Sequence, residues 1–307
     1  MLEVDVNPES SPKLGAESGA PRTEAAPTVK QAAKLVTLIG PTRSWQLLNI
    51  RELWIFRELI YFLAWRDVKV RYKQTVLGAA WAVLQPALMM VVFSIVFGRM
   101  AKLPSGPGVQ YPVFVLAGLL PWTFFSTAIS SAANSVVGSE RLITKIYFPR
   151  LAIPFASVAV ALVDFLVACG LLALVMAYYH VAPTPQILLM PVILAIILLA
   201  ALGLGTLLAA LNVAYRDFRY VVPFLVQIGM FATPTIYMQP SGHEGRWIQT
   251  LLIANPMTGL IAGFRDCVLG GSIPWASVAA AAAVAVILFL SGCFYFRRVE
   301  DSFADII

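Results

Sequence analysis

The sequence predicts an all-α integral membrane protein with six transmembrane helices. Of its 307 residues, 59% are hydrophobic and only 12% are charged, whereas soluble domains carry about 25% charged residues. The apolar residues gather in runs of about 20, the length that crosses the core of a bilayer. Basic residues outnumber acidic ones, which gives a net charge of +6, and they cluster beside these runs. That placement is typical of membrane orientation and argues against a nucleic-acid partner.

Six apolar runs are the candidate spans, since a helix needs about 20 residues to cross the hydrocarbon core. They are residues 76–98, 111–137, 151–179, 187–214, 221–238 and 275–296. The fifth run is the weakest candidate, because it is short and carries Pro223, Gln227 and Pro234. The third contains Asp164, the only acidic or basic residue within a span. We expect Asp164 to pair with a backbone or Ser/Thr group, to face a wet cavity, or to take part in transport.

The distribution of basic residues supports six spans with both termini in the cytosol. Under this topology the cytosolic segments carry more Lys and Arg than the external ones, as the positive-inside rule requires. The cytosolic residues are Arg66, Lys69, Arg71, Lys73, Arg141, Lys145, Arg150, Arg216, Arg219, Arg297 and Arg298. The external residues are Arg99, Lys102, Arg246 and Arg265. Without the fifth span, Arg297 and Arg298 would lie outside and break the pattern.

The segments around the spans differ in composition. Residues 1–41 are rich in Pro, Ala, Ser and Glu and lack the apolar core of a signal peptide. We expect them to form a disordered cytosolic tail. Residues 42–75 are expected to contain an amphipathic helix, residues 76–298 the six-helix domain, and residues 299–307 a cytosolic C-terminus.

An aromatic stripe marks the helix before the first span. Trp54, Tyr61, Trp65, Val68 and Tyr72 recur at four- and seven-residue steps and share one helical face. Basic side chains lie broadly opposite, which is typical of a helix at the membrane–water interface, although docking against protein would give a similar pattern. The candidate residues of this helix are Trp54, Tyr61, Trp65, Arg66, Lys69, Arg71 and Tyr72.

Two loops carry more apolar residues than simple linkers do. The cytosolic loop 138–150, GSERLITKIYFPR, is amphipathic, and we expect it either to lie on lipid or to fit a soluble partner. The external loop 239–274 holds two apolar segments separated by Asn255 and Pro256. Each is too short to span a bilayer, so we expect them to dip into the outer leaflet or to cap the helices.

The chain lacks the motifs of an enzyme or a metal site. It contains no GxxxxGK[ST] phosphate-binding loop, no GxSxG and no HExxH sequence. The positions of Cys169, Cys267 and Cys293 suit neither a zinc site nor a disulfide framework. We therefore expect no catalytic residues, metal or cofactor in this chain. A membrane enzyme is disfavoured, and so is an ion-coupled carrier, which usually keeps several charges within its spans.

The spans are instead rich in aromatic residues. Packing against lipid or neighbouring helices is the ordinary role of such side chains. A second interpretation is a conduit for a sugar polymer, because aromatic faces stack on sugar C–H surfaces without fixing one register. The candidates for lining such a conduit are Phe93, Phe97, Phe125, Phe231 and Tyr237.

Several stretches, taken in order, resemble one transporter family. They are LAWRDVKVRYKQTVLGAAWAVLQP at 63–86, YPVFVLAGLLPWTFFS at 111–126, ERLITKIYFPR at 140–150, LNVAYRDFRYVVPFL at 211–225, NPM at 255–257 and GFR at 263–265. Together they resemble the ABC-2 type permeases that export polysaccharides, over residue 53 to the C-terminus. Within the family, the resemblance is closest to exporters of O-antigen and related lipid-linked polysaccharides.

The resemblance implies a channel-forming permease of an ATP-binding-cassette exporter in the bacterial inner membrane. It implies a homodimer in contact with membrane lipids, with two separate ATPase subunits that bind ATP and Mg. Capsule, teichoic-acid or drug exporters are alternatives within the family, and an ATP-independent channel or carrier is an alternative outside it.

The resemblance also suggests roles for three regions. The helix around Trp54 to Tyr72 would be an interface helix. The coupling helix would contain Glu140, Arg141, Leu142, Ile143, Thr144, Lys145, Ile146, Tyr147, Phe148, Pro149 and Arg150. The periplasmic gate would contain Trp247, Asn255, Pro256, Met257 and Arg265.

Overall fold

The computed structural model describes residues 54–73, 80–106, 108–145, 148–238, 252 and 254–303. Within these ranges every regular element is a helix, which confirms the predicted all-α class. The predicted tail at 1–41 lies outside the described residues. So do Ile146, Tyr147, Trp247 and residues 304–307.

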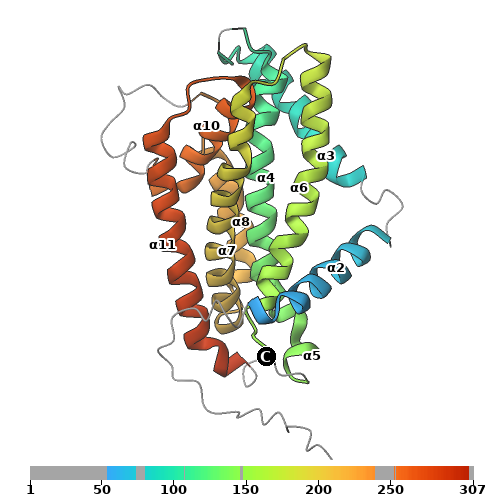
Figure 1. The fold of residues 1–307 in the computed structure, drawn as a ribbon, viewed down its shortest axis with the longest axis vertical. Helices are drawn as coiled ribbons and strands as arrows, with labels where there is room; N and C mark the ends of the chain where they lie inside the picture. Colours follow the sequence, from blue (N-terminus) through green and yellow to red (C-terminus); the bar gives the residue numbers. More distant parts are fainter. Residues whose placement is uncertain are drawn as a thin grey trace, which may run out of the picture. The chain divides into compact units, whose positions relative to one another are not determined.

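Among the described residues, five helices are long and apolar enough to cross a bilayer. α3, Ala80–Phe93, continues as the π-helix η1, Ser94–Met100. The others are α4, Tyr111–Ser135; α6, Ala152–Tyr178; η3, Pro185–Leu189, with α7, Met190–Ala214; and α11, Trp275–Val299. They run side by side along the long axis of Figure 1. All five correspond to predicted spans.

The fifth predicted span, 221–238, is a shorter helix than expected. α8, Phe218–Ala232, has 15 residues and is about 22 Å long, less than the bilayer core of about 30 Å. The helix ends because Thr233 precedes Pro234, and a residue before proline is disfavoured in the α conformation. Thr233 accordingly has φ −104° and ψ 138°. The chain later forms α10, Pro256–Leu269, which packs beside α11 and α4.

Two apolar clusters mark the two ends of the bundle. We call one the α2 end, because α2, Arg57–Lys73, packs there. Its cluster includes Leu63, Val136, Ile143, Leu151 and Phe296, from α2, the end of α4, α5, the start of α6 and the end of α11. The short elements η2, Val137–Ser139, α5, Glu140–Ile143, and η4, Glu300–Ser302, belong to the same end.

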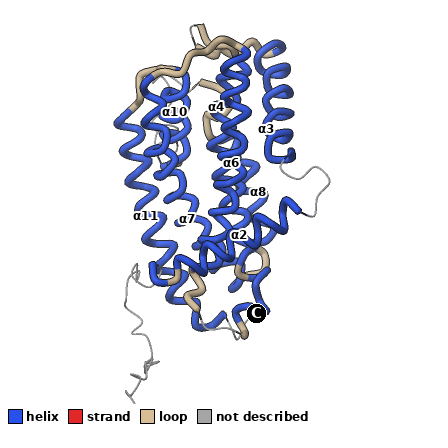
Figure 2. The backbone as a smooth tube through the Cα atoms, turned by 45° about the vertical axis from the view of Figure 1, so that its right-hand side comes forward, coloured by secondary structure: helices blue, strands red, loops and turns tan. Residues whose placement is uncertain are grey.

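The opposite end of the bundle is built from the starts and ends of other helices. We call it the α10 end, and its cluster includes Phe93, Tyr111, Phe114, Leu119 and Ile236. In Figures 1 and 2 α10 sits in the same half of the bundle as the loops that join the upper ends of the helices.

α4 is the central helix and α3 is peripheral. In the most apolar window of α4, 78% of the residues are buried, compared with 6% for the α3–η1 span. α7 and α11 cross closely at Gly203 and Gly292, where a Cβ on Gly292 would collide with the carbonyl oxygen of Gly203. Small residues allow such close approach, which helix packing within a bilayer requires because lipid tails are as apolar as the side chains.

Candidate functional site

The predicted coupling segment is anchored by its apolar side chains. Ile143 and Phe148 are each only 7% exposed and pack in the cluster at the α2 end, with Leu63 and Val136 among their neighbours. Leu142 is partly buried against the same cluster. The exposed side chains of this segment are Glu140, Arg141, Thr144 and Lys145. The segment therefore presents a charged and polar surface, whereas its aliphatic residues hold it to the bundle.

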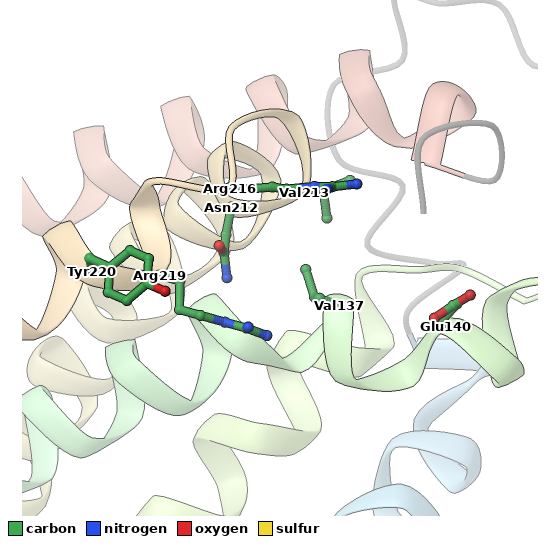
Figure 3. Close-up of a pocket in the computed structure, with 7 residues that line it drawn as sticks. All are labelled: Val137, Glu140, Asn212, Val213, Arg216, Arg219 and Tyr220. Atoms are coloured by element: carbon green, nitrogen blue, oxygen red, sulfur yellow. The ribbon is translucent and has the colours of Figure 1, made fainter.

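A pocket of about 390 Å³ lies beside this segment. Val137 and Glu140 line one side, and residues from the end of α7 and the start of α8 line the other (Figure 3). The second group consists of Asn212, Val213, Arg216, Arg219 and Tyr220. The sequence identifies Arg216 and Arg219 only as charges that set orientation. It gives no signal that they share a pocket with Glu140.

Asn212, which lines this pocket, is buried and hydrogen-bonded to α4. It is 4% exposed, and its Nδ2 donates to the carbonyl oxygen of Ala133 at 2.8 Å and to Oδ1 of Asn134 at 3.3 Å. These bonds tie the end of α7 to the end of α4. A shift of the α7–α8 turn would therefore be transmitted to the central helix.

Two residues of the aromatic stripe, Tyr61 and Trp65, face away from the bundle. Tyr61 and Trp65 stack with their ring centroids 6.3 Å apart and an interplanar angle of 9°, and both are exposed. Lys69 lies over the Trp65 ring, with 5.5 Å between Nζ and the centroid. Leu63, by contrast, is buried against the bundle. These two rings are thus free to contact lipid.

Tyr72 was grouped with this stripe, but in the structure it turns toward α6. Its hydroxyl donates to Oδ1 of Asp164, and Nη1 of Arg71 lies 2.8 Å from Oδ2 of the same carboxylate. Asp164 therefore pairs with two side chains of α2, not with a backbone or Ser/Thr group. Burial, followed by the hydrogen bond and the charge of Asp164, raises the pKa of Tyr72 to about 12. The phenol stays protonated at neutral pH and remains a donor.

This ion pair lies at the edge of a groove of about 700 Å³ between α3, α4 and α6. Most of its lining is apolar, including Trp81, Met89, Phe93 and Phe165. Asp164 lines the groove as well.

The five candidate conduit residues fall into three groups. Phe93 and Phe97 lie 5.8 Å apart between ring centroids in the cluster at the α10 end. Phe125 is 5% exposed, inside the core of the bundle. Phe231 is 52% exposed, and its carbonyl oxygen accepts a hydrogen bond of 3.2 Å from the hydroxyl of Tyr237. Of these five residues, Phe231 is the most exposed at the surface of the chain.

The predicted gate residues gather where α8 ends. Asn255 caps α10, because its Oδ1 accepts from the backbone N–H of Met257 at 3.0 Å. The Asn255 Nδ2 also donates to Oγ1 of Thr233 at 2.8 Å. Pro256 occupies the first turn of α10, and Met257 is fully buried in the core.

Arg265 is the most enclosed charge at the α10 end. It is 6% exposed, and its Nη2 donates to the carbonyl oxygen of Thr235 at 2.6 Å and to that of Pro234 at 3.3 Å. Its guanidinium carbon lies 3.9 Å from the centroid of the Phe114 ring. Arg265 therefore joins α10 to the segment that follows α8 and to the first turn of α4.

Several known proteins are similar in sequence to this chain over most of its length. The O-antigen export system permease protein RfbA of Myxococcus xanthus is 31% identical over 261 residues, which cover 84% of this chain and 98% of the relative. A protein of the same description from Klebsiella pneumoniae is 25% identical over 252 residues, 81% and 95% of the two chains. The polysialic acid transport protein KpsM of Escherichia coli is 22% identical over 215 residues, 68% and 80% of the two chains.

A family model described as the ABC-2 type transporter matches residues 58–269. The match begins in α2 and ends at the last residue of α10, so it includes the coupling segment, the ion pair at Asp164 and the Arg265 contacts. It agrees with the all-helical bundle and with its apolar spans. The chain is a multi-pass membrane protein that belongs to the ABC-2 type transporter family.

Proposed function

We propose that the chain is the permease subunit of an ATP-driven exporter of a lipid-linked polysaccharide. The observation that carries this proposal is the neutralised carboxylate of Asp164. In the spans α4, α6, α7 and α11, the acidic and basic residues are Asp164 and, in the last turn of α11, Arg297 and Arg298. The carboxylate of Asp164 is paired with Arg71 and Tyr72. A carrier driven by an ion gradient needs ionisable groups along its path. The energy for transport would therefore come from outside the spans.

The α2 end is proposed to face the cytosol of a bacterial cell. Arg216 and Arg219 lie there, and so do Arg141 and Lys145 of the coupling segment. Among the described residues at the α10 end, the exposed cations are Arg99 and Lys102, and Arg265 is buried. This asymmetry supports an inner-membrane protein with both termini in the cytosol, because basic residues are retained on that side.

Energy is proposed to enter at the α2 end through two ATPase subunits, which would bind ATP and Mg. The exposed side chains of the coupling segment and the pocket between Glu140 and Arg219 form adjoining polar surfaces. The hydrogen bonds of Asn212 tie this region to the central helix α4. A partner that moves the segment would therefore move the bundle.

Two copies of the chain are proposed to enclose the conduit. The outer face of α8 carries an apolar stripe at three- and four-residue spacing. It consists of Val221, Phe224, Leu225, Ile228 and Phe231, each at least 38% exposed. A stripe of this kind suits a passage for a polymer, since weak stacking at several points holds a sugar chain without stalling it. The export functions in the names of the relatives support a polysaccharide cargo, and capsular polysaccharide is the second candidate.

The proposal is tested in cells. Deleting the chain should leave polysaccharide in the cytosol, and a tagged copy should restore surface polymer and copurify with an ATPase. The matched control is a strain in which the ATPase alone is inactivated, which should show the same accumulation. Normal surface polymer in the deletion strain, or a complemented strain whose export does not require an ATPase, would overturn it.

A further inference from the structure

The segment from Thr233 to Ile236, which we call the strap, is non-helical backbone made of turns and bends within the bundle. Thr233 and Thr235 are fully buried and Ile236 is 3% exposed. In a membrane protein, a buried non-helical backbone must find its hydrogen-bond partners within the protein. The identity of those partners shows what holds the strap in place.

Two side chains from different helices bind three consecutive carbonyl groups of the strap. Arg265 of α10 donates to Pro234 and Thr235. Tyr111, at the first residue of α4, donates its hydroxyl to the carbonyl oxygen of Ile236 at 2.7 Å. The strap is thus held from both sides, and the charged donor supplies two of the three bonds.

The surroundings of Arg265 are shaped to fit this contact. Burial lowers the pKa of its guanidinium to about 10, so the group keeps its charge at neutral pH. The Phe114 ring faces the charge, an arrangement that stabilises a desolvated cation. A Cβ on Gly118 would collide with both the Arg265 Nη2 and the Thr235 carbonyl oxygen. Glycine at position 118 therefore leaves the space that the contact occupies.

The strap joins two of the candidate conduit residues. Phe231 lies two residues before it, exposed in the last turn of α8, and Tyr237 follows it directly. The hydroxyl of Tyr237 returns to the carbonyl oxygen of Phe231. The strap therefore sets where Tyr237 lies relative to the last turn of α8, which carries Phe231.

We propose that Arg265 is a positioning residue that clamps the strap against α4 and so sets Phe231 and Tyr237 at the outer end of the conduit. The role of these two aromatic residues rests on the function proposed above. The clamp itself rests on the contacts of Arg265, Tyr111 and Gly118. Lysine would lose the contact with Phe114, because an ammonium lacks the planar guanidinium face that lies over that ring.

The position of the strap is measured with a cysteine reporter at Met238, which is 46% exposed and lies two residues beyond the strap. The Met238→Cys protein, in complex with its ATPase, is labelled with a membrane-impermeant maleimide added from the outer side. The parent chain with its three native cysteines gives the background. Arg265→Lys and Gly118→Ala are then added separately. Gly170→Ala is the matched control, because a Cβ there meets nothing within 4 Å.

We expect the labelling rate at position 238 to change roughly tenfold in Arg265→Lys and Gly118→Ala, the effect of losing about one hydrogen bond to a charged group. Gly170→Ala should leave the rate unchanged. Tyr111→Phe removes only the bond to Ile236 and should shift the rate in the same direction by less. Surface polymer, normalised to permease abundance, should fall with the first two variants.

A merely structural role would lower abundance without changing the labelling of the folded fraction. Unchanged labelling in Gly118→Ala at normal abundance would overturn the clamp, even if Arg265→Lys failed to fold. Because labelling requires no cargo, its result is independent of the export function. Failure of that function would appear separately, as normal surface polymer in cells that lack the chain.

Discussion

Arg71 of α2 and Asp164 of α6 form an ion pair, with 2.8 Å between Nη1 and Oδ2. Asp164 lies about 18 Å along α6 from its first residue, at 1.5 Å per residue, so the end of α2 reaches well into the bundle. Tyr72 completes the site by donating to the other carboxylate oxygen. These two adjacent side chains attach an otherwise lipid-exposed helix to the transmembrane domain.

The first prediction concerns this attachment. Asp164→Asn should loosen the end of α2, because it removes the charge that Arg71 and Tyr72 share. Arg71 is 46% exposed, so we expect the change to loosen α2 and to leave the bundle folded. Proteolysis at the end of α2 in the purified complex measures it. The exchanged pair Arg71→Asp with Asp164→Arg should recover part of the protection. An exchanged pair as labile as either single variant would contradict the ion pair.

The second prediction concerns pH. The pKa of Tyr72 is raised from 10.0 to about 12, so its contribution is fully present below pH about 10 and is lost as the pH rises through about 12. Attachment of α2 should not change between neutral pH and about 10 through this group. Subtracting the tyrosinate absorbance titration of Tyr72→Phe from that of the parent should leave one phenol with a pKa near 12. A difference curve centred near the ordinary value of about 10 would refute the buried hydrogen bond.

The third prediction distinguishes residues that hold the coupling segment to the bundle from residues that bind the ATPase. Ile143→Asp should reduce permease abundance, because it places a charge in the buried cluster at the α2 end. Lys145→Glu should keep abundance and weaken ATPase binding, because Lys145 is exposed. Copurified ATPase per permease measures the second effect, with Thr144→Ala as a conservative control. Normal abundance of Ile143→Asp with selective loss of the ATPase would instead place Ile143 at the partner surface.

The fourth prediction compares two phenylalanines. Phe231→Ala should reduce export of long polymers at normal abundance, because its ring is exposed. Phe125→Ala should lower stability by roughly 3–5 kcal/mol, the usual cost of emptying a core site, because Phe125 is enclosed. Surface polymer length and thermal stability are measured for both variants. Normal export with Phe231→Ala would remove this residue from the conduit.

Much of the fold could be predicted from local sequence. The sixth span, expected at 275–296, is α11 at Trp275–Val299, because an uninterrupted apolar run determines a transmembrane helix. The early end of α8 has a local signal in Pro234, one of the residues that make the fifth run the weakest candidate. Thr233 stands before Pro234, and that pair alone disfavours a continued helix.

The side-chain partners could not be predicted in the same way. Tyr72 and Asp164 are 92 positions apart, and no periodicity connects them. The amphipathic pattern around Ile143 predicts contact with lipid or with a soluble partner, whereas the side chain packs within the bundle. A pattern alone cannot distinguish the core of the chain from the surface of a partner. Arg216 and Arg219 were visible only as charges, because a pocket depends on how α4, α7 and α8 meet.

The most direct test of the proposed transport is reconstitution of the purified permease and its ATPase in proteoliposomes. Lipid-linked polysaccharide is supplied on the side of the α2 end, together with ATP and Mg, and polymer is measured on the opposite side with a glycosidase that cannot cross the membrane. The proposal predicts that polymer reaches the opposite side only with hydrolysable ATP and with both proteins present. Polymer movement driven by an ion gradient without the ATPase, or ATP hydrolysis by the complex with no polymer translocated, would contradict it.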